Sequence, residues 1–187
     1  LTIFDNLIEM HFSTSSQVGK PTKLSSTFPE VPGMVFHNYI LSSSKSGDNS
    51  YIYGAPYSLD RFGTGTLPIN QSNFVVKGSL PDPEYQIAFE LHTMLLEQRI
   101  TINELPKAVR QLEIEPVDVN KMKLIYENNG ASLIEIIIET NMQSINLFAE
   151  HMLTLIGLEK SNIGSTENGI SILETFWKEK INTDGLH

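Results

Sequence analysis

Five histidines are the side chains best suited to metal binding or acid–base chemistry, and their spacing matches no common site pattern. They are His11, His37, His92, His151 and His187. A zinc-binding helix usually carries two histidines four residues apart, and no pair here has that spacing. Glu150 and His151 are adjacent, so on a helix their side chains would point about 100° apart. We therefore predict isolated surface or core-edge histidines, with no metal and no cofactor.

Two other patterns superficially suggest catalysis. Gly63-Thr64-Gly65-Thr66 resembles a phosphate-binding loop, but it lacks the Gly-Lys-Ser/Thr ending and has no serine between its glycines. Carboxylates such as Glu90 and Glu97 stand at helical spacing, which is typical of a solvated helix face rather than of a pair converging in a cleft. The sequence therefore predicts a flexible loop at residues 63–66 and singles out no catalytic residue.

Tyrosines gather in and beside the first predicted hairpin. They are Tyr39, Tyr51, Tyr53 and Tyr57. Tyr51 and Tyr53 would share one strand face, and Tyr39 would oppose them across the turn. Such pairs ordinarily stabilise a sheet, but exposed tyrosines are also enriched at protein interfaces. These four residues are the candidate interaction site.

Composition limits the classes of partner and compartment. A net charge of −9 argues against phosphate-driven binding to nucleic acid or anionic lipid. No run approaches 18 apolar residues, so we expect no membrane span, and no basic segment precedes the first apolar residues as in a signal peptide. The chain has no cysteine, which fits a reducing compartment. We therefore expect a soluble protein of the cytoplasm or of a virion.

The two parts of the chain differ in amino-acid composition. Residues 1–82 are rich in serine and proline, whereas residues 83–187 hold eight Lys/Arg against sixteen Asp/Glu. The first part predicts strands and long loops, and the second predicts mainly helices. At 187 residues the two parts fit a single domain over residues 1–187.

Local patterns place elements in the first part. Apolar spacing predicts a short helix over residues 1–11, and a Ser/Thr/Pro-rich stretch predicts a loop over residues 13–32. β-rich runs predict strands at residues 34–41 and 50–53, joined as a hairpin, and another strand at residues 73–77.

Helix signals dominate the second part. Asp82 suits an N-cap and Pro83 the first helical position, so a helix starts there. A second helix is predicted over residues 103–112. Residues 141–157 are apolar almost all round, which predicts the central core helix, and a stripe over residues 170–181 predicts the last helix.

Residues 121–139 allow two interpretations. Asn129-Gly130 is a strong hairpin signal, because both residues tolerate a positive φ. On a helix, by contrast, Glu135 and Glu139 would be neighbours one turn apart. The three isoleucines at residues 136–138 are stiff at χ1 and favour a strand. The predicted fold is α+β, with a loop-rich antiparallel N-terminal sheet, about four helices and a second hairpin near 121–139.

Three functions compete, and the sequence leaves open whether the chain is an enzyme. The leading hypothesis is a non-enzymatic interaction or assembly protein, such as a complex subunit, adaptor, chaperone or immunity-type inhibitor, with a protein partner or self-association. The second is a small hydrolase or transferase whose site combines distant His, Glu, Tyr and Ser residues. The third is a winged-helix regulator of DNA, which the scarcity of lysine disfavours.

Overall fold

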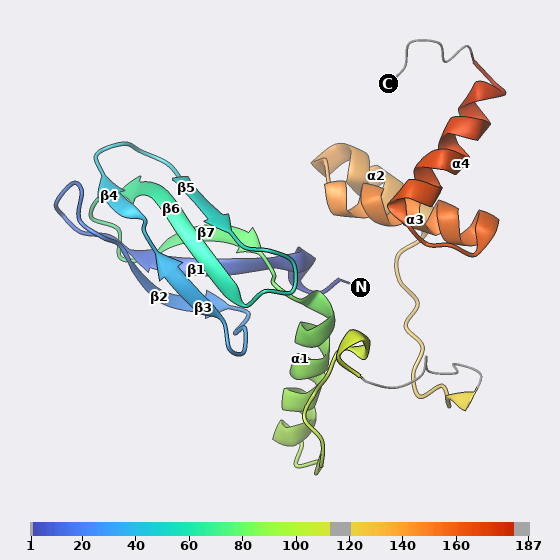
Figure 1. Ribbon diagram of the computed structural model, residues 1–187, viewed down its shortest axis with the longest axis horizontal. Helices are drawn as coiled ribbons and strands as arrows, with labels where there is room; N and C mark the ends of the chain where they lie inside the picture. Colours follow the sequence, from blue (N-terminus) through green and yellow to red (C-terminus); the bar gives the residue numbers. More distant parts are fainter. Residues whose placement is uncertain (1, 113–120, 182–187) are drawn as a thin grey trace. The chain divides into compact units, whose positions relative to one another are not determined.

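A computed structural model describes residues 2–112 and 121–181 of the chain (Figure 1). The residues fall into two compact units, Leu1–Val117 and Asp118–His187. The boundary between the two units follows Val117 and does not coincide with the change of composition near residue 82. A single domain over the whole chain stays a prediction.

The first unit is built of strands followed by one α-helix. Its elements in chain order are η1 (Phe4–Asn6), β1 (Leu7–Ser13), β2 (Lys23–Phe28), β3 (Val35–Asn38), β4 (Leu41–Ser43), β5 (Asn49–Tyr53), β6 (Asp60–Pro68), β7 (Phe74–Ser79), α1 (Pro83–Glu97) and η2 (Val109–Gln111).

Strand β1 is the centre of a three-stranded antiparallel sheet of order β2-β1-β7. Ile8, Met10 and Phe12 alternate along β1 and are fully buried, so the apolar period is two rather than that of a helix. The predicted helix over residues 1–11 is therefore wrong. The predicted loop over residues 13–32 is wrong in part, because β2 lies within it.

The second sheet is mixed and has β6 at its centre. Strands β3 and β4 run parallel to β6 along one edge, and β5 pairs antiparallel with the other edge. Val35 pairs with Asp60 and Leu41 with Thr66, an offset of 25 in both cases, so β3 and β4 behave as one interrupted strand. The antiparallel prediction thus holds for the first sheet only.

For the first predicted hairpin, the strands are confirmed, but the prediction that they pair with each other is wrong. The strands expected at residues 34–41 and 50–53 both form, but β6 lies between them. Residues 63–66, expected as a loop, lie inside β6. A local pattern identifies a strand, whereas the choice of its neighbour depends on a segment far along the chain.

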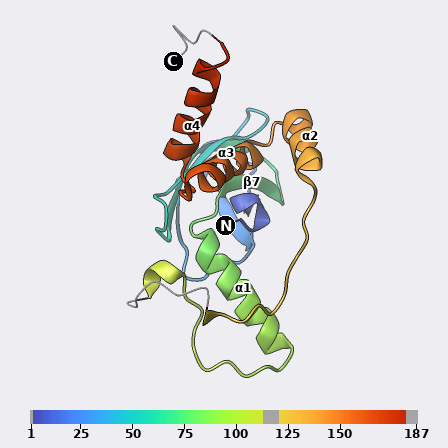
Figure 2. The same cartoon turned by 90° about the vertical axis from the view of Figure 1, so that its right-hand side faces the viewer.

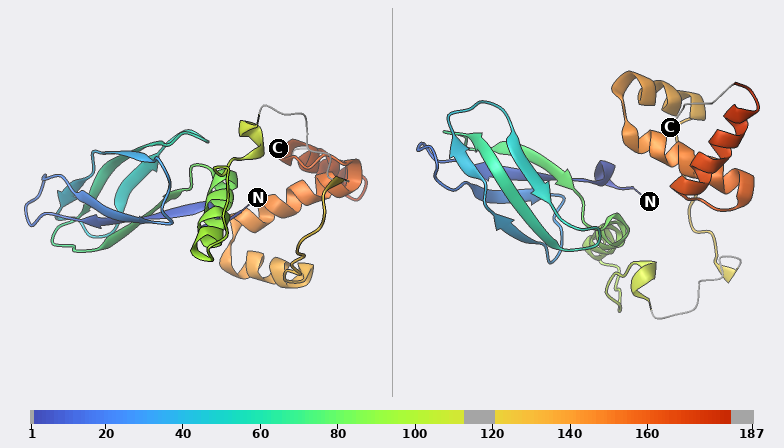
Figure 3. Two further views of the ribbon diagram at one scale, coloured as in Figure 1. Left: turned by 90° about the horizontal axis from the view of Figure 1, so that it is seen from below. Right: turned by 45° about the horizontal axis from the view of Figure 1, so that its top comes forward.

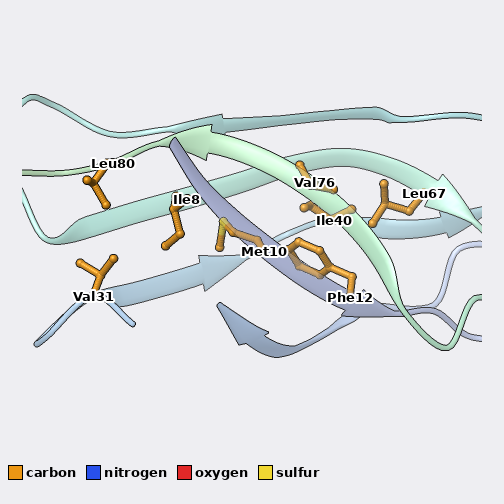
Figure 4. Packing of buried hydrophobic residues seen from close by; sticks show 8 residues of the cluster. All are labelled: Ile8, Met10, Phe12, Val31, Ile40, Leu67, Val76 and Leu80. Atoms are coloured by element: carbon orange, nitrogen blue, oxygen red, sulfur yellow. The ribbon is translucent and has the colours of Figure 1, made fainter. Parts of the chain in front are cut away.

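The apolar core of the first unit lies between the two sheets (Figure 4). Both sheets and the segments beside them contribute to it. Its members are Ile8, Met10, Phe12, Val31, Ile40, Leu67, Val76 and Leu80.

Helix α1 begins as predicted, and the helix expected after it does not form. The Asp82 side chain accepts a hydrogen bond from the Tyr85 backbone N–H at 3.0 Å, and Pro83 occupies the first helical position. Residues 103–112 contain only the short η2. Pro106 explains the failure, because the residue before a proline is biased away from helical geometry.

The second unit contains three helices in its described residues, α2 (Leu133–Gln143), α3 (Asn146–Ser161) and α4 (Thr166–Lys178). Figures 2 and 3 show α3 and α4 crossing, with α2 beside α3. Gly169 allows the close crossing, since a Cβ there would lie 2.3 Å from the Leu153 carbonyl oxygen. The prediction of a last helix near residues 170–181 is confirmed in substance.

The second hairpin near 121–139 is wrong, and the helical alternative is correct. The Glu135 carboxylate accepts hydrogen bonds from the backbone N–H and the hydroxyl of Ser132, at 2.8 and 2.7 Å, which caps α2. The helix expected over residues 141–157 is divided between α2 and α3. No large apolar side chain is buried among the described residues of this unit, so α3 is not the core helix that was predicted.

The α+β fold class and the expectation of about four helices are confirmed. Across residues 2–112 and 121–181, no helix is long and apolar enough to cross a membrane. Placement in the cytoplasm or in a virion stays a prediction.

Candidate functional site

The four predicted interaction tyrosines are all exposed, at 55–65% of their maximal surface, but they do not form the predicted cluster. Tyr51 and Tyr53 stack on β5 with ring centroids 6.2 Å apart. Tyr39 lies between β3 and β4, where its N–H bonds the Gly63 carbonyl at 2.8 Å, so β6 separates it from the stacked pair. The expectation that Tyr39 opposes Tyr51 and Tyr53 directly is therefore wrong, while their role in binding stays a prediction.

An aromatic row crosses the second sheet beside these tyrosines. Tyr53, Phe62 and His37 are in register across β5, β6 and β3. The His37 ring stacks on Phe62 with centroids 4.6 Å apart and planes 13° apart. Its Nε2 lies 3.1 Å from the Asp60 carboxylate. The row is partly exposed to solvent, and it holds no nucleophile beside the histidine.

Tyr57 belongs to a separate ionic cluster at the start of α1. The Arg110 guanidinium lies 4.2 Å from the centre of the Tyr57 ring and pairs with Asp82 and Glu84. Tyr57, Asp82 and Arg110 border a pocket of about 410 Å³, which Lys107 also lines. Because Arg110 binds two carboxylates and Asp82 also caps α1, the cluster is best explained as a clamp that holds the segment after α1.

The remaining candidate groups do not assemble into a metal site. In the described ranges, no three His, Asp or Glu side chains lie close enough together to hold a metal ion. His11 bonds the Asn73 side chain at 2.8 Å through its Nδ1. Arg61 is buried at 2% exposure, and it donates to the carbonyls of Ala55 and Ser58. Burial lowers the pKa of Arg61 from its usual value.

The polar corner between α2 and α3 has a backbone conformation that is unusual for a serine. Ser144, the C-cap of α2, is left-handed at φ 53° and ψ 46°. Its N–H bonds the Thr140 carbonyl. Asn146 is the first residue of α3, and both Ser144 and Asn146 are exposed. Left-handed non-glycine residues cost energy and cluster at functional sites.

No side chain caps the start of α3 at this corner, since its N-cap residue is Ile145. The Phe148 N–H bonds the Ile145 carbonyl at 3.2 Å, so the N–H groups of Asn146 and Leu147 are the ones left for a ligand, together with the Ser144 hydroxyl and the Asn146 amide. The corner can donate and accept hydrogen bonds, but it contains no nucleophile–base pair. Sequence reasoning missed it because its cue, one serine two residues before an asparagine, is short.

Comparisons with known proteins identify a fold. No protein-family model matches the chain, and no curated protein matches it by sequence. A crystal structure of penicillin-binding protein 4 from Haemophilus influenzae matches with a TM-score of 0.68 at 12% identity, covering 100% of this chain and 39% of that chain. The same protein complexed with a novel β-lactam matches with a TM-score of 0.65 at 13% identity, covering 97% and 40%.

This similarity overturns the leading prediction of a non-enzymatic interaction or assembly protein. The structural neighbours are two structures of a penicillin-binding protein, one of them complexed with a β-lactam. The winged-helix alternative also fails, because residues 122–127, where the described part of its third helix was expected, contain no helix. The chain spans 39–40% of the length of the solved neighbours. It therefore shares its fold with part of penicillin-binding protein 4.

Proposed function

We propose that residues 1–187 belong to a penicillin-binding, serine acyl-transfer enzyme, and that the Ser144–Asn146 corner forms one side of its active site. The observation that carries the proposal is the fold shared with penicillin-binding protein 4, one structure of which holds a β-lactam. The likeness extends over nearly the whole chain, so the corner lies within the matched region.

A sequence motif at the corner supports this assignment. Penicillin-binding proteins carry three short motifs, S-x-x-K, S-D-N and K-T-G, which line the site of acylation. Ser144-Ile145-Asn146 is the only Ser-x-Asn triplet in the 187 residues. It departs from the S-D-N form by having isoleucine in the middle. Its two polar residues are exposed, as a substrate-facing pair requires.

Each polar residue of the triplet has a chemical role in the proposal. The Ser144 hydroxyl both donates and accepts, so it can pass a proton to the amide nitrogen that leaves when the β-lactam ring opens. The Asn146 side chain can donate to a substrate carbonyl and accept from a substrate amide. The cost of the left-handed backbone at Ser144 is consistent with a position retained for function.

The nucleophile is proposed to come from polypeptide beyond this chain. The only Ser-x-x-Lys spacing is Ser42 to Lys45. Ser42 is buried at 1% exposure on β4, and its hydroxyl accepts a hydrogen bond from the Ser15 N–H at 2.9 Å. A buried hydroxyl already used to fix a loop cannot reach a substrate. The chain has no Lys-Thr-Gly triplet.

The test is covalent labelling of the whole protein that contains this chain with a fluorescent penicillin, followed by mass spectrometry of the adduct. We expect one acyl adduct per molecule. We expect Ser144→Ala and Asn146→Ala to slow acylation by about 100-fold each, since a positioned proton-transfer group or hydrogen-bond donor contributes about that much.

Ser171→Ala is the matched control, because Ser171 is an exposed serine on α4 away from the corner. It should label at the unsubstituted rate. A whole protein that forms no adduct with any β-lactam would contradict the proposal. So would equal labelling rates for all three variants.

Tyr39, Tyr51 and Tyr53 are kept as a proposed contact surface of the first unit. Their exposure and the stacking of Tyr51 on Tyr53 support it. Replacing the stacked pair by serine should leave acylation of a small β-lactam unchanged. A slower acylation would instead place this face at the acylation site.

A further inference from the structure

The loop at residues 54–59, the start of α1 and the segment after α1 line the pocket of about 410 Å³ in the first unit. This volume is within the range of small-molecule sites, whose walls are mostly apolar and carry a few polar groups. Leu59 and Leu105 supply apolar wall, and Lys107 and Gln111 supply polar groups. The pocket thus has the size and the composition of a ligand site.

The loop at residues 54–59 is fixed at a free-energy cost. Arg61 is 2% exposed, and its Nη1 donates to the backbone carbonyls of Ala55 and Ser58 at 3.2 and 2.7 Å. Its Nε has no hydrogen-bond partner, and no described carboxylate compensates its charge. Burying a charge without an opposite charge is expensive. An unpaired buried cation therefore holds the loop on both sides of Tyr57.

Tyr57 is the residue through which this loop reaches the pocket. Its φ is 63°, in the left-handed region that a tyrosine rarely adopts, and its N–H bonds the Pro81 carbonyl at 3.0 Å. Residues held in such conformations cluster at binding and active sites. The Arg110 guanidinium lies 4.2 Å from the centre of the Tyr57 ring and so braces it. This wall of the pocket is preorganised by two costly features, the buried Arg61 and the left-handed Tyr57.

The segment after α1 contributes hydrogen-bond donors to the pocket. Lys107 is exposed and forms no ion pair with any described residue. The Gln111 side-chain carbonyl accepts a backbone N–H at 2.8 Å, which leaves its NH₂ group as the end that can donate to a ligand. Asp82 is the one carboxylate among the described lining residues, and it already accepts from the α1 backbone and from Arg110. The pocket therefore has donors to spare and no unoccupied carboxylate.

We propose that this pocket binds a carboxylate attached to an apolar body. The carboxylate accepts from Lys107 and Gln111, and the apolar body contacts Leu59 and Leu105. A cationic ligand would find no unoccupied carboxylate, and inorganic phosphate would have no apolar body to cover the leucines. A free organic acid and the C-terminus of a peptide share this chemistry. The pocket lies wholly in the first unit, so this inference does not rest on the proposed acylation.

The first experiment measures the binding of N-acetyl-leucine to the whole protein that contains this chain, by ligand-observed NMR titration. A ligand of this size should bind with a dissociation constant of about 1–10 mM. N-acetyl-leucine amide has the same apolar body without the charge, and acetate has the charge without the body. Each should bind at least about 10-fold more weakly. Equal binding of the acid and its amide would overturn the proposal, and so would the absence of binding by the acid.

The second experiment removes the cation. Lys107→Ala should weaken the binding of N-acetyl-leucine by about 10-fold, whereas Lys107→Arg should keep most of it, because arginine retains the charge and the donors. Lys45→Ala is the matched control, since it removes the same charge from an exposed lysine outside the pocket lining. It should bind with the unsubstituted affinity. Equal losses for Lys107→Ala and Lys45→Ala would show an effect of net charge alone and would exclude the site.

The third experiment places a negative charge on the apolar wall. Leu105 is 77% exposed, so Leu105→Glu should leave the fold intact while it weakens the binding of N-acetyl-leucine by at least about 10-fold. Val109→Glu is its control, because Val109 is 69% exposed and lies outside the pocket lining. If both variants bind N-acetyl-leucine as the unsubstituted protein does, the wall takes no part in binding and the proposal fails.

Two comparisons separate this pocket from the acylation corner and identify the source of the carboxylate. Asn146→Ala should leave the binding of N-acetyl-leucine unchanged. A loss of binding in Asn146→Ala but not in Lys107→Ala would assign the carboxylate to the corner and overturn the site. Tighter binding of N-acetyl-dialanyl-leucine than of N-acetyl-leucine would support the proposal with a peptide C-terminus as the ligand. Binding of N-acetyl-leucine alone would support it with a free acid.

Discussion

Replacing Ser144 by glycine should stabilise the second unit and at the same time weaken β-lactam acylation. Ser144 has φ 53° and ψ 46°, the left-handed conformation in which glycine carries no Cβ penalty. A non-glycine residue pays about 1–2 kcal/mol there. Glycine in turn loses about 0.5–1 kcal/mol more backbone entropy on folding. The net expectation is a gain of about 0.5–1 kcal/mol in the free energy of unfolding.

Urea unfolding followed by the fluorescence of Trp177 measures this gain. Trp177 is the only tryptophan of the chain and lies on α4, so its signal reports on the second unit. With a slope of about 1 kcal/mol per molar urea, the midpoint should rise by about 0.5–1 M. Ser144→Ala keeps the Cβ and should give no such rise. Both variants lack the hydroxyl, so both should acylate more slowly.

Asn162→Gly is the control for the backbone effect. Asn162 caps the end of α3 at φ 58°, also left-handed, but asparagine tolerates this conformation better than serine. Its gain should be only a few tenths of a kcal/mol, with acylation unchanged. A Ser144→Gly midpoint at or below that of the unsubstituted chain would refute the argument that this residue is strained. A Ser144→Gly protein that acylates at full rate would refute the role of its hydroxyl.

Three further predictions follow from the packing and the charges. Gly169→Ala should lower the free energy of unfolding of the second unit by about 1–3 kcal/mol in the same urea assay, because its Cβ would collide with the Leu153 carbonyl oxygen. Arg110→Ala should cost about 1–2 kcal/mol and speed amide exchange after α1, since two carboxylates lose their partner. Hydrogen bonds from Ser132 lower the pKa of Glu135 below its ordinary value, so the cap is present at neutral pH and is lost as the pH falls through that lowered pKa. Carboxyl NMR should show this low pKa, and Ser132→Ala should raise it.

Several elements could be predicted from the sequence because their signals are local. The start of α1 depends on Asp82 and Pro83, which act within a single turn. The strand at β7 and the helix at α4 likewise follow from short apolar patterns. Residues close in sequence determine such elements, whatever the position of the element in the fold.

Other elements were decided by competition between local signals. Asn129-Gly130 predicted a hairpin, yet Ser132 and Glu135 cap a helix a few residues later. The capping hydrogen bonds outweigh the β propensity of the isoleucines at residues 136–138. At the N-terminus, a pattern that fitted a helix became β1, because β2 and β7 were available to pair with it on both edges.

By itself the sequence determined the α+β class, the start of α1, the scarcity of basic charge and the absence of thiol chemistry, because these depend on composition or on residues a few positions apart. Only the tertiary structure decided the pairing of β3 and β5 through β6, the left-handed corner at Ser144 and the unburied apolar faces of α2 and α3. The strand pairing arises from contacts between segments far apart in the chain, whereas the Ser144 corner depends on the backbone path between two helices. Physical pairing and burial are properties of the assembled fold, and no local pattern encodes them.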